Sequence, residues 1–342
     1  MDRILVIRLS SIGDIILASP LVAALRARYP GARIDFAVKA RFADLLRFDP
    51  HIDDILAFDG GSGMPGLLGL ARRVRDAKYD LVVDIHRTYR STVIKLLAGA
   101  GATRTFDKQY LKRALLVWGK WNLHGDRVTT MPERYVDCVR DLIGDMDMPP
   151  VTLHIDEQSR ASALARLASK GPSENQPLVA LAPGAAWHTK RWPPDRFGEL
   201  GAMLAGQNKA AVAVVGGEGD RDVARHVYGR IGDAAIDLTG TTSLLETAVI
   251  IQRAGLLVSN DTGCMHMGRA LRTPMVALFG CTVRELGYYP HGQQVAIIEK
   301  PVACRPCTHN GRRRCPKGHF KCMRDITVDE VFRAAQDLLR IS

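Results

Sequence analysis

Short apolar runs alternate with longer amphipathic stretches along most of the chain. In the first half the runs read ILVIRL, RIDFAV, DDILAF and DLVVDI, at residues 4–9, 33–38, 53–58 and 80–85. Nearly continuous apolar runs are typical of strands in a parallel sheet that is buried on both faces. Because helix-like stretches separate these runs, the pattern predicts an α/β doubly wound domain.

A second series of apolar runs follows a polar interruption, GPSENQP at residues 171–177. Its members are LVALAPG, AAVAVVGG, LLVSND and PMVALFG, at residues 178–184, 210–217, 256–261 and 274–280. We therefore predict two doubly wound domains, over residues 1–160 and 175–325, followed by a helix over 326–342. That helix would begin after Thr327 as N-cap and carries one apolar stripe, Val328, Val331, Phe332, Leu338 and Leu339.

The net charge of +11 indicates an anionic partner: nucleic acid, a membrane surface or a phosphorylated substrate. No run of eighteen or more apolar residues is present, so the sequence predicts no membrane-spanning helix. The run IILASPLVAAL at residues 15–25 resembles a signal-peptide core, but Arg8 and Asp14 lie just before it and ILVIRL already predicts a strand. We expect no export signal, and hence seven cysteines kept reduced in the cytoplasm.

Ligands of doubly wound sheets bind beyond the carboxyl ends of the strands, so the polar residues there are the candidates for function. After the first strand, Ser10, Ser11 and Gly13 form a predicted turn and Asp14 opens a helix. Two interpretations of Asp14 stay open: an acid stabilised by the helix dipole, or a catalytic base. The turn lacks the glycine fingerprint of a dinucleotide site and the Lys-Ser/Thr of a P-loop.

Three loops of the second domain carry further candidates. In APGAAWHTKRWPP, Lys190 and Arg191 precede a helix and suit a diphosphate, although an exposed basic loop explains them equally well. In VVGGEGDRD a carboxylate could bind ribose hydroxyls, or the loop is a plain turn. In SNDTGCMH, Asp261 or Thr262 can cap a helix whose free N–H groups, Gly263 included, form an anion site.

These segments, in this order, resemble the heptosyltransferases of bacterial lipopolysaccharide assembly, glycosyltransferase family 9. The matching features are SSIGDIILASP, YDLVVDIHRTYRS, PGAAWHTKRWP, GGEGDRD and, most specific, SNDTGCMHMGRALRTPMVALFG. The resemblance implies a GT-B fold, in which two Rossmann-like domains face each other across a cleft and the last helix packs back on the N-terminal domain. It also implies an enzyme that transfers heptose from ADP-heptose to the lipopolysaccharide inner core with inversion and without a metal.

The resemblance further implies a role for each candidate residue. The N-terminal domain would bind the lipid-linked acceptor, with Asp14 as general base and Ser10, Ser11 and Gly13 on the acceptor side. The C-terminal domain would bind ADP-heptose through Lys190 at the diphosphate and through a donor site of Asp261, Thr262, Gly263 and His266. Glu218 or Asp220 would hold the adenosine end. His266 could equally be a core histidine, and Ala185-Ala186 stands where some members carry a hydroxyl.

The segment CRPCTHNGRRRCPKGHFKC places Cys304, Cys307, Cys315 and Cys322 in a C-x2-C-x7-C-x6-C pattern. Four thiolates can hold a structural zinc ion. Reduced packing thiols, labile disulfides and an iron–sulfur cluster are the alternatives, because the spacing is not that of a standard zinc finger.

Two basic clusters accompany these motifs. Eight Lys and Arg residues and no acid lie between Lys300 and Arg324, and a second cluster lies beside ALLVW at 114–118: Arg104, Lys108, Lys112, Arg113 and Lys120. They suit peripheral docking on the anionic inner face of the inner membrane, or are ordinary solvated surface. Two other functions remain: a GT-B enzyme for another nucleotide sugar or acceptor, and a nucleic-acid-binding protein with a zinc-knuckle-like tail.

Overall fold

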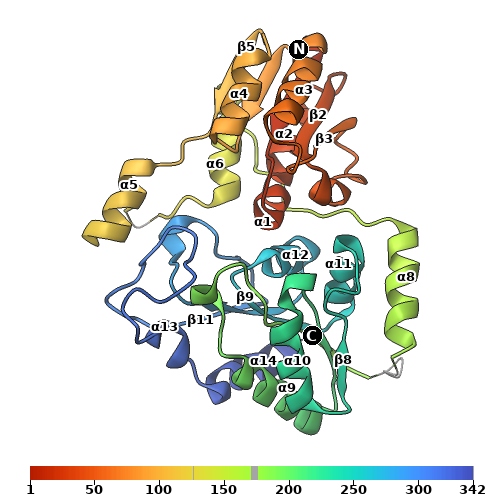
Figure 1. The fold of residues 1–342 in the computed structure, drawn as a ribbon, viewed down its shortest axis with the longest axis vertical. Helices are drawn as coiled ribbons and strands as arrows, with labels where there is room; N and C mark the ends of the chain where they lie inside the picture. The colour runs from red at the N-terminus through yellow and green to blue at the C-terminus, as the bar shows by residue number, and fades with distance from the viewer. Residues whose placement is uncertain (126, 171–175, 342) are drawn as a thin grey trace. The chain divides into compact units, whose positions relative to one another are not determined.

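A computed structural model describes residues 1–125, 127–170 and 176–341, which form two compact units (Figure 1). The first unit comprises Met1–Tyr110 and Thr129–His154. The second comprises Leu111–Val128 and the described chain from Ile155 onward. Most of the polar interruption expected between the domains, residues 171–175, lies outside the described residues.

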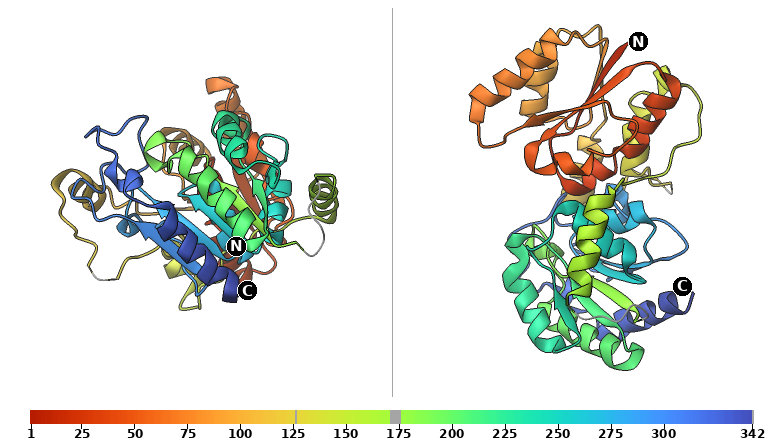
Figure 2. Two further views of the ribbon diagram at one scale, coloured as in Figure 1. Left: turned by 90° about the horizontal axis from the view of Figure 1, so that it is seen from below. Right: turned by 90° about the vertical axis from the view of Figure 1, so that its right-hand side faces the viewer.

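The first unit is built on a parallel sheet with strand order β3-β2-β1-β4-β5. The strands are β1 (Arg3–Ile7), β2 (Arg33–Lys39), β3 (Asp54–Phe58), β4 (Leu81–Asp84) and β5 (Ala102–Thr105). Its helices are α1 (Ile12–Ile16), α2 (Ser19–Arg28), η1 (Ala40–Leu45), α3 (Gly63–Asp76), α4 (Tyr89–Leu97), α6 (Met131–Asp137) and α7 (Arg140–Ile143). Helix α3 packs beside α4 and α2 beside α6, on opposite faces of the sheet (Figure 2).

The second unit is built on a parallel sheet with strand order β11-β10-β9-β6-β7-β8. The strands are β6 (Leu178–Ala182), β7 (Ala211–Val214), β8 (Ala235–Asp237), β9 (Leu256–Asn260), β10 (Met275–Phe279) and β11 (Val295–Glu299). The helices are α8 (Glu157–Ala168), η3 (His188–Lys190), α9 (Pro194–Asn208), η4 (Glu218–Asp220), α10 (Arg221–Ile231), α11 (Leu244–Arg253), α12 (Gly263–Leu271), η5 (Arg284–Leu286), α13 (Lys321–Arg324) and α14 (Val328–Ile341). Both sheets therefore have the doubly wound pattern that the apolar runs predict.

The last helix packs within the second unit. Val331 and Phe332 of α14 are buried in the same core cluster as Trp192 and Phe197 of this unit. The Thr327 hydroxyl accepts a hydrogen bond from the backbone N–H of Glu330, as expected of an N-cap. The helix lies against α9 and strands β9 to β11, because the face of the sheet next to α9 offers an apolar surface that its stripe can cover.

The segment Leu111–Val128 and the first residues of helix α8 belong to the second unit, although both fall within the range 1–160 predicted for the first domain. Helix α8 packs on α11, where its Arg160 and Ser162 donate hydrogen bonds to Gln252 and Glu246. Residues 111–128 hold α5 (Tyr110–Ala114) and the π-helical turn η2 (Leu115–Gly119), and the ammonium of Lys120 donates to the carbonyls of Cys304 and Pro306 at 2.9 and 2.5 Å. Within the described parts of the chain, no helix is long and apolar enough to cross a membrane.

Candidate active site

Asp14 is buried at the start of α1, directly after the carboxyl end of β1. A guanidinium nitrogen of Arg8 lies 2.7 Å from its Oδ2. The Ser11 hydroxyl donates to the same oxygen at 2.8 Å, and the Tyr135 hydroxyl of α6 lies 3.1 Å from Oδ1. Arg8 also donates to the carbonyl of Ile85, so it bridges the ends of β1 and β4. The predicted turn thus carries a carboxylate that is fixed on several sides.

The surroundings keep the Asp14 carboxylate ionised. Burial opposes its charge, but the Arg8 guanidinium and the hydrogen bonds from Ser11 outweigh burial and hold the pKa of Asp14 well below its usual range. A base must be unprotonated to accept a proton, and this group meets that condition at any physiological pH. Ser10 and Gly13 lie in the same turn, on either side of Ser11 in the sequence.

His86 is a neighbour of this site that the sequence interpretation missed. It follows β4 in the chain, and burial together with the Arg8 guanidinium lowers its pKa to about 3, so the imidazole is neutral. Its backbone N–H donates to Asp84 Oδ1, and the same oxygen accepts from the N–H of Arg87. Ligands bind beyond strand ends, and this rule would have pointed to His86 as it does to Asp14. Nothing in the sequence spacing, however, marks Arg8 or Tyr135 as partners of Asp14.

The second polar cluster joins Lys190 to Asp261 in the second unit. The Lys190 ammonium lies 2.6 Å from Asp261 Oδ2, with side chains 16% and 5% exposed. The Thr282 hydroxyl donates to the same oxygen at 2.9 Å. Lys190 ends η3 after β6, Asp261 follows β9 and Thr282 follows β10, so three neighbouring strand ends supply the cluster.

Helix α12 begins at this cluster with Thr262 as N-cap and Gly263 as the first helical residue. Its first N–H groups have no acceptor within the helix, which leaves them available to an anion. Asn260 fixes the turn, since its side-chain amide donates to the carbonyl of Pro183 and its oxygen accepts from the N–H of Trp192. His266 lies inside the helix, 4% exposed, with its ring centroid 6.1 Å from that of Tyr288.

Of the two acids expected at the adenosine end, Asp220 lies next to the loop that follows β6. A Cβ added to Gly184, in the loop after β6, would fall on the Asp220 carboxylate, and that carboxylate accepts from the N–H of Gly217 at 3.1 Å. Glu218 points to solvent with its side chain 83% exposed. The Thr189 hydroxyl, four residues after Ala185, is buried and hydrogen-bonded to the backbone of Arg312.

The four cysteines of the C-terminal segment are the candidates for a structural zinc site. Among the described residues, Cys304, Cys307, Cys315 and Cys322 are free thiols, and none belongs to a group of three or more ligand atoms within 4.8 Å of one another. The Cys304 sulfur lies 3.7 Å from the Nε2 atom of His319. Cys322 is buried in the apolar core of the second unit, and Cys315 packs against that core. Metal binding by this segment stays a prediction.

The sequence profile of glycosyltransferase family 9 (heptosyltransferase) matches residues 67–317. The chain belongs to this family. The lipopolysaccharide heptosyltransferase 2 of Salmonella typhimurium is 28% identical to it, over 81% of this chain and 82% of the relative. The lipooligosaccharide heptosyltransferase 2 of Haemophilus ducreyi is 26% identical, over 98% of this chain and 99% of the relative. This family 9 protein is thus a glycosyltransferase, as the motifs predict.

Solved structures confirm the fold of this family 9 glycosyltransferase. The glycosyl transferase family 9 structure from Veillonella parvula aligns with a TM-score of 0.84 at 24% identity, covering 100% of this chain and 99% of that one. The structure of E. coli ADP-heptose lps heptosyltransferase II aligns with a TM-score of 0.78 at 23% identity, with the same coverage. The predicted GT-B class, with two parallel-sheet α/β units, is confirmed.

Proposed function

We propose that this family 9 enzyme transfers heptose from ADP-heptose to the inner core of lipopolysaccharide. The names of its relatives support this donor and acceptor, since they are lipopolysaccharide and lipooligosaccharide heptosyltransferases. The observation that carries the proposal is the Lys190–Asp261 pair at the start of α12, a cation next to free helix N–H groups. Such a site suits the diphosphate of a nucleotide sugar.

In the proposed reaction an acceptor hydroxyl attacks the anomeric carbon of the donor as the bond to the ADP oxygen breaks. The hydroxyl proton passes to a carboxylate oxygen of Asp14, and ADP leaves with its negative charge. Because the pKa of Asp14 is low, it is a weak base, so the proton would move late, when the hydroxyl has already gained acidity from the new bond. Arg8 and Tyr135 would hold the carboxylate in place for this transfer.

The departing ADP would be stabilised by Lys190 and by the N–H groups of Thr262 and Gly263. These groups are fixed before the reaction, and fixed charges and dipoles aimed at developing charge lower the barrier without reorganisation. Asp261 would aim Lys190, because its Oδ2 atom contacts the Lys190 ammonium and is itself held by the Thr282 hydroxyl. Asp220, rather than the exposed Glu218, would bind the adenosine ribose, and His266 would pack behind the helix start.

The test is ADP release from ADP-heptose, measured with and without a heptose-deficient lipopolysaccharide core, with mass spectrometry of the lipid. We expect release that depends on acceptor and one added heptose. Asp14→Asn should lose transfer by about 100-fold or more and keep its affinity for ADP-heptose. Binding of ADP-heptose without turnover on any core acceptor would contradict the proposed acceptor, and no binding would contradict the donor.

Asp35→Asn is the matched control for the Asp14 variant. Asp35 is a buried carboxylate of the same sheet that pairs with Arg33 and accepts a hydrogen bond from Tyr79, so it has the same kinds of partner. Its loss should lower stability and leave turnover of the folded enzyme unchanged. Equal activity losses in both variants would show that Asp14 acts through folding alone. The nucleic-acid alternative has no support, because the family profile and the relatives are those of glycosyltransferases.

We also propose that the surface over residues 111–123 contacts an anionic membrane. Four apolar side chains on it are largely exposed: Leu111 at 72%, Trp118 at 81%, Trp121 at 65% and Leu123 at 51%. Lys112 and Arg113 lie beside them in the sequence and carry the positive charge that attracts anionic lipid. Not every member of the basic cluster is available, because Lys120 is bound to carbonyls and Arg104 pairs with Asp141 at 2.5 Å.

Co-sedimentation with vesicles of anionic or zwitterionic phospholipid tests this surface. Leu111→Ser and Trp118→Ser should each reduce binding to anionic vesicles, and binding should fall as salt concentration rises. Leu96→Ser is the control, since Leu96 is 74% exposed on α4, outside the 111–123 surface. Equal binding by all variants would reject the 111–123 surface as the contact.

A further inference from the structure

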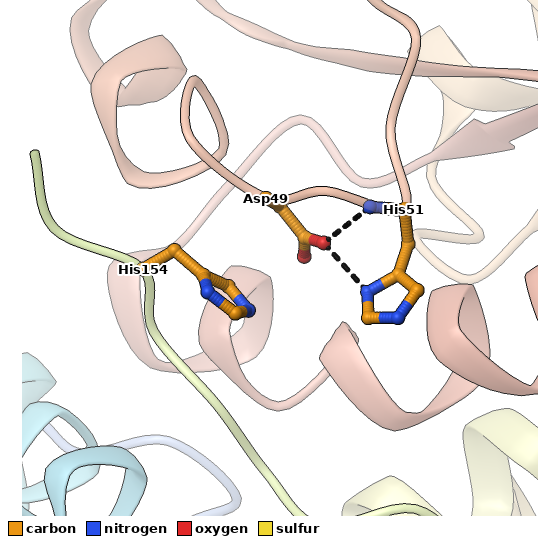
Figure 3. A group of neighbouring side chains, drawn as sticks. All are labelled: Asp49, His51 and His154. Atoms are coloured by element: carbon orange, nitrogen blue, oxygen red, sulfur yellow. Dashed lines mark hydrogen bonds and ion pairs between the residues drawn. The ribbon is translucent and has the colours of Figure 1, made fainter.

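Asp49, His51 and His154 bring three potential metal ligands together in the first unit, outside the candidate active site. One ligand atom from each lies within 4.8 Å of the other two. Asp49 and His51 lie in the loop between η1 and β3, whereas His154 is the last residue of the first unit. Figure 3 shows the Asp49 carboxylate between the two imidazole rings. Residues about a hundred positions apart therefore converge on one point.

The spacing suits a shared ion. The Nδ1 atom of His51 lies 2.9 Å from Asp49 Oδ1. Two ligands that each lie about 2.0–2.2 Å from a zinc ion in tetrahedral geometry are separated by roughly 3.3 Å. The Asp49–His51 distance is slightly shorter than this, and a shift of a few tenths of an ångström would admit the ion between them.

His154 is what distinguishes the group from a local hydrogen-bonded pair. Asp49 and His51 alone form an ordinary short-range contact, in which the N–H of His51 also donates to Asp49 Oδ1 at 3.0 Å. The Nε2 atom of His154 is buried and has no hydrogen-bond partner among the described residues. A buried nitrogen without a partner costs free energy unless a ligand satisfies it, which gives His154 a reason to bind an ion.

We propose that Asp49, His51 and His154 form a site for a divalent transition-metal ion of the zinc class. Two imidazoles and one carboxylate are a ligand set that zinc accepts, and the net charge of one carboxylate offsets half that of the ion. The His51 side chain is 32% exposed, which leaves room for water as a fourth ligand. The Asp49 side chain is 7% exposed, so the carboxylate ligand is held in a fixed position.

The bound ion would fasten the chain segment that leaves the first unit. The N–H of Thr152 donates to the Ser19 hydroxyl at the start of α2, so the segment is already attached two residues earlier. An ion that joins His154 to the loop before β3 would extend this attachment to the last residue of the unit. Its role would be structural, separate from sugar transfer, and the proposal does not depend on the donor or acceptor.

The experiment uses the full-length chain, stripped of metal with a chelator and titrated with Co²⁺ and then Zn²⁺ under reducing conditions. Cobalt bound by imidazole and carboxylate absorbs weakly in the visible range, whereas cobalt bound by cysteine gives an intense thiolate charge-transfer band. The two kinds of site are therefore counted separately. We expect one ion per chain with the nitrogen–oxygen spectrum, displaced by Zn²⁺, and a Zn²⁺-dependent rise in Tm of several degrees.

The variants His154→Gln and Asp49→Asn decide the assignment. Both keep side-chain size and hydrogen-bonding capacity, and each should weaken this binding by about 100-fold or more and remove the Tm rise. His226→Gln is the control, because His226 also pairs with a carboxylate, Asp195, at 2.5 Å on the second unit. The proposal is overturned if the wild type shows no nitrogen–oxygen cobalt spectrum, or if His154→Gln and Asp49→Asn bind as the wild type does.

Discussion

Arg8 places a guanidinium nitrogen 2.7 Å from the carboxylate of Asp14, and both side chains are about nine-tenths buried. Inside a protein such a pair interacts more strongly than at the surface, and removing one partner leaves an uncompensated charge. The protonation state of the proposed base is therefore governed by a residue that does not itself take the proton.

Replacing Arg8 by Met should raise the pKa of Asp14, because burial would no longer be outweighed by a cation. A carboxyl whose folded pKa is depressed contributes stability that is present above its unfolded pKa near 4 and is lost as pH falls below that value. In Arg8→Met that contribution shrinks, and the acid limb of the kcat/KM profile should move to higher pH. The measurement is the pH profile of sugar transfer, together with unfolding at several pH values.

Arg33→Met is the control for the Arg8 variant, since Arg33 pairs with the carboxylate of Asp35 at 3.0 Å on the same sheet. It should alter stability and leave the pH profile of turnover in place. An unchanged acid limb in Arg8→Met would contradict the role of Arg8 in holding Asp14 ionised.

Lys190→Met should weaken binding of ADP-heptose by about 10- to 100-fold, because a hydrogen bond to a charged group contributes about 1.5–3 kcal/mol. Asp261→Asn should weaken it less, since the Thr282 contact remains while Lys190 loses its fixed position. Calorimetry with ADP and ADP-heptose measures both effects. Lys170→Met, which removes an exposed lysine of the same unit, should bind as the wild type does. Equal affinities for all three variants would reject Lys190 as a diphosphate ligand.

Gly184→Ala should displace Asp220, because the added methyl group would occupy the space of its carboxylate. We expect affinity for ADP to fall by about tenfold or more if Asp220 binds the ribose, a loss comparable with that of one hydrogen bond. Gly206→Ala is the control within α9, where an added Cβ meets no atom within 4 Å and alanine favours the helix by roughly 0.5–1 kcal/mol. Unchanged ADP affinity in Gly184→Ala would remove Asp220 from the donor site.

Phe332→Ala should destabilise the second unit by about 3–5 kcal/mol, the usual cost of deleting a buried phenylalanine side chain. Asp337→Ala, at an exposed position of the same helix, should change stability by less than about 0.5 kcal/mol. Denaturant unfolding followed by tryptophan fluorescence reports on this unit, because Trp192 lies in the same core cluster. Similar midpoints for both variants would argue against the packing of α14 in this core.

Much of the fold and the position of the candidate site residues could be predicted because parallel strands leave a strong local signal. The apolar runs at 4–9 and 178–184 contain most of strands β1 and β6. The polar residues that follow these strands form the turns that carry Asp14 and Lys190. The residues that contact Asp14 could not be predicted from the sequence. Tyr135 lies 121 positions away on α6, and no pattern along the chain relates the two. Such pairs arise when separate elements pack, so they follow from topology rather than from spacing.

Potential metal ligands show the same division between sequence and structure. The close spacing of the four cysteines is visible in the sequence, and metal binding there stays a prediction. The group of Asp49, His51 and His154, in contrast, joins a loop before β3 to the last residue of the first unit. The chain by itself determined the strands, the turns after them and the chemistry they carry, because side-chain periodicity is a local property. Tertiary structure decided which unit covers the stripe of α14, which cation meets Asp14 and where distant ligands converge, because burial and charge pairing depend on contacts between residues far apart in the sequence.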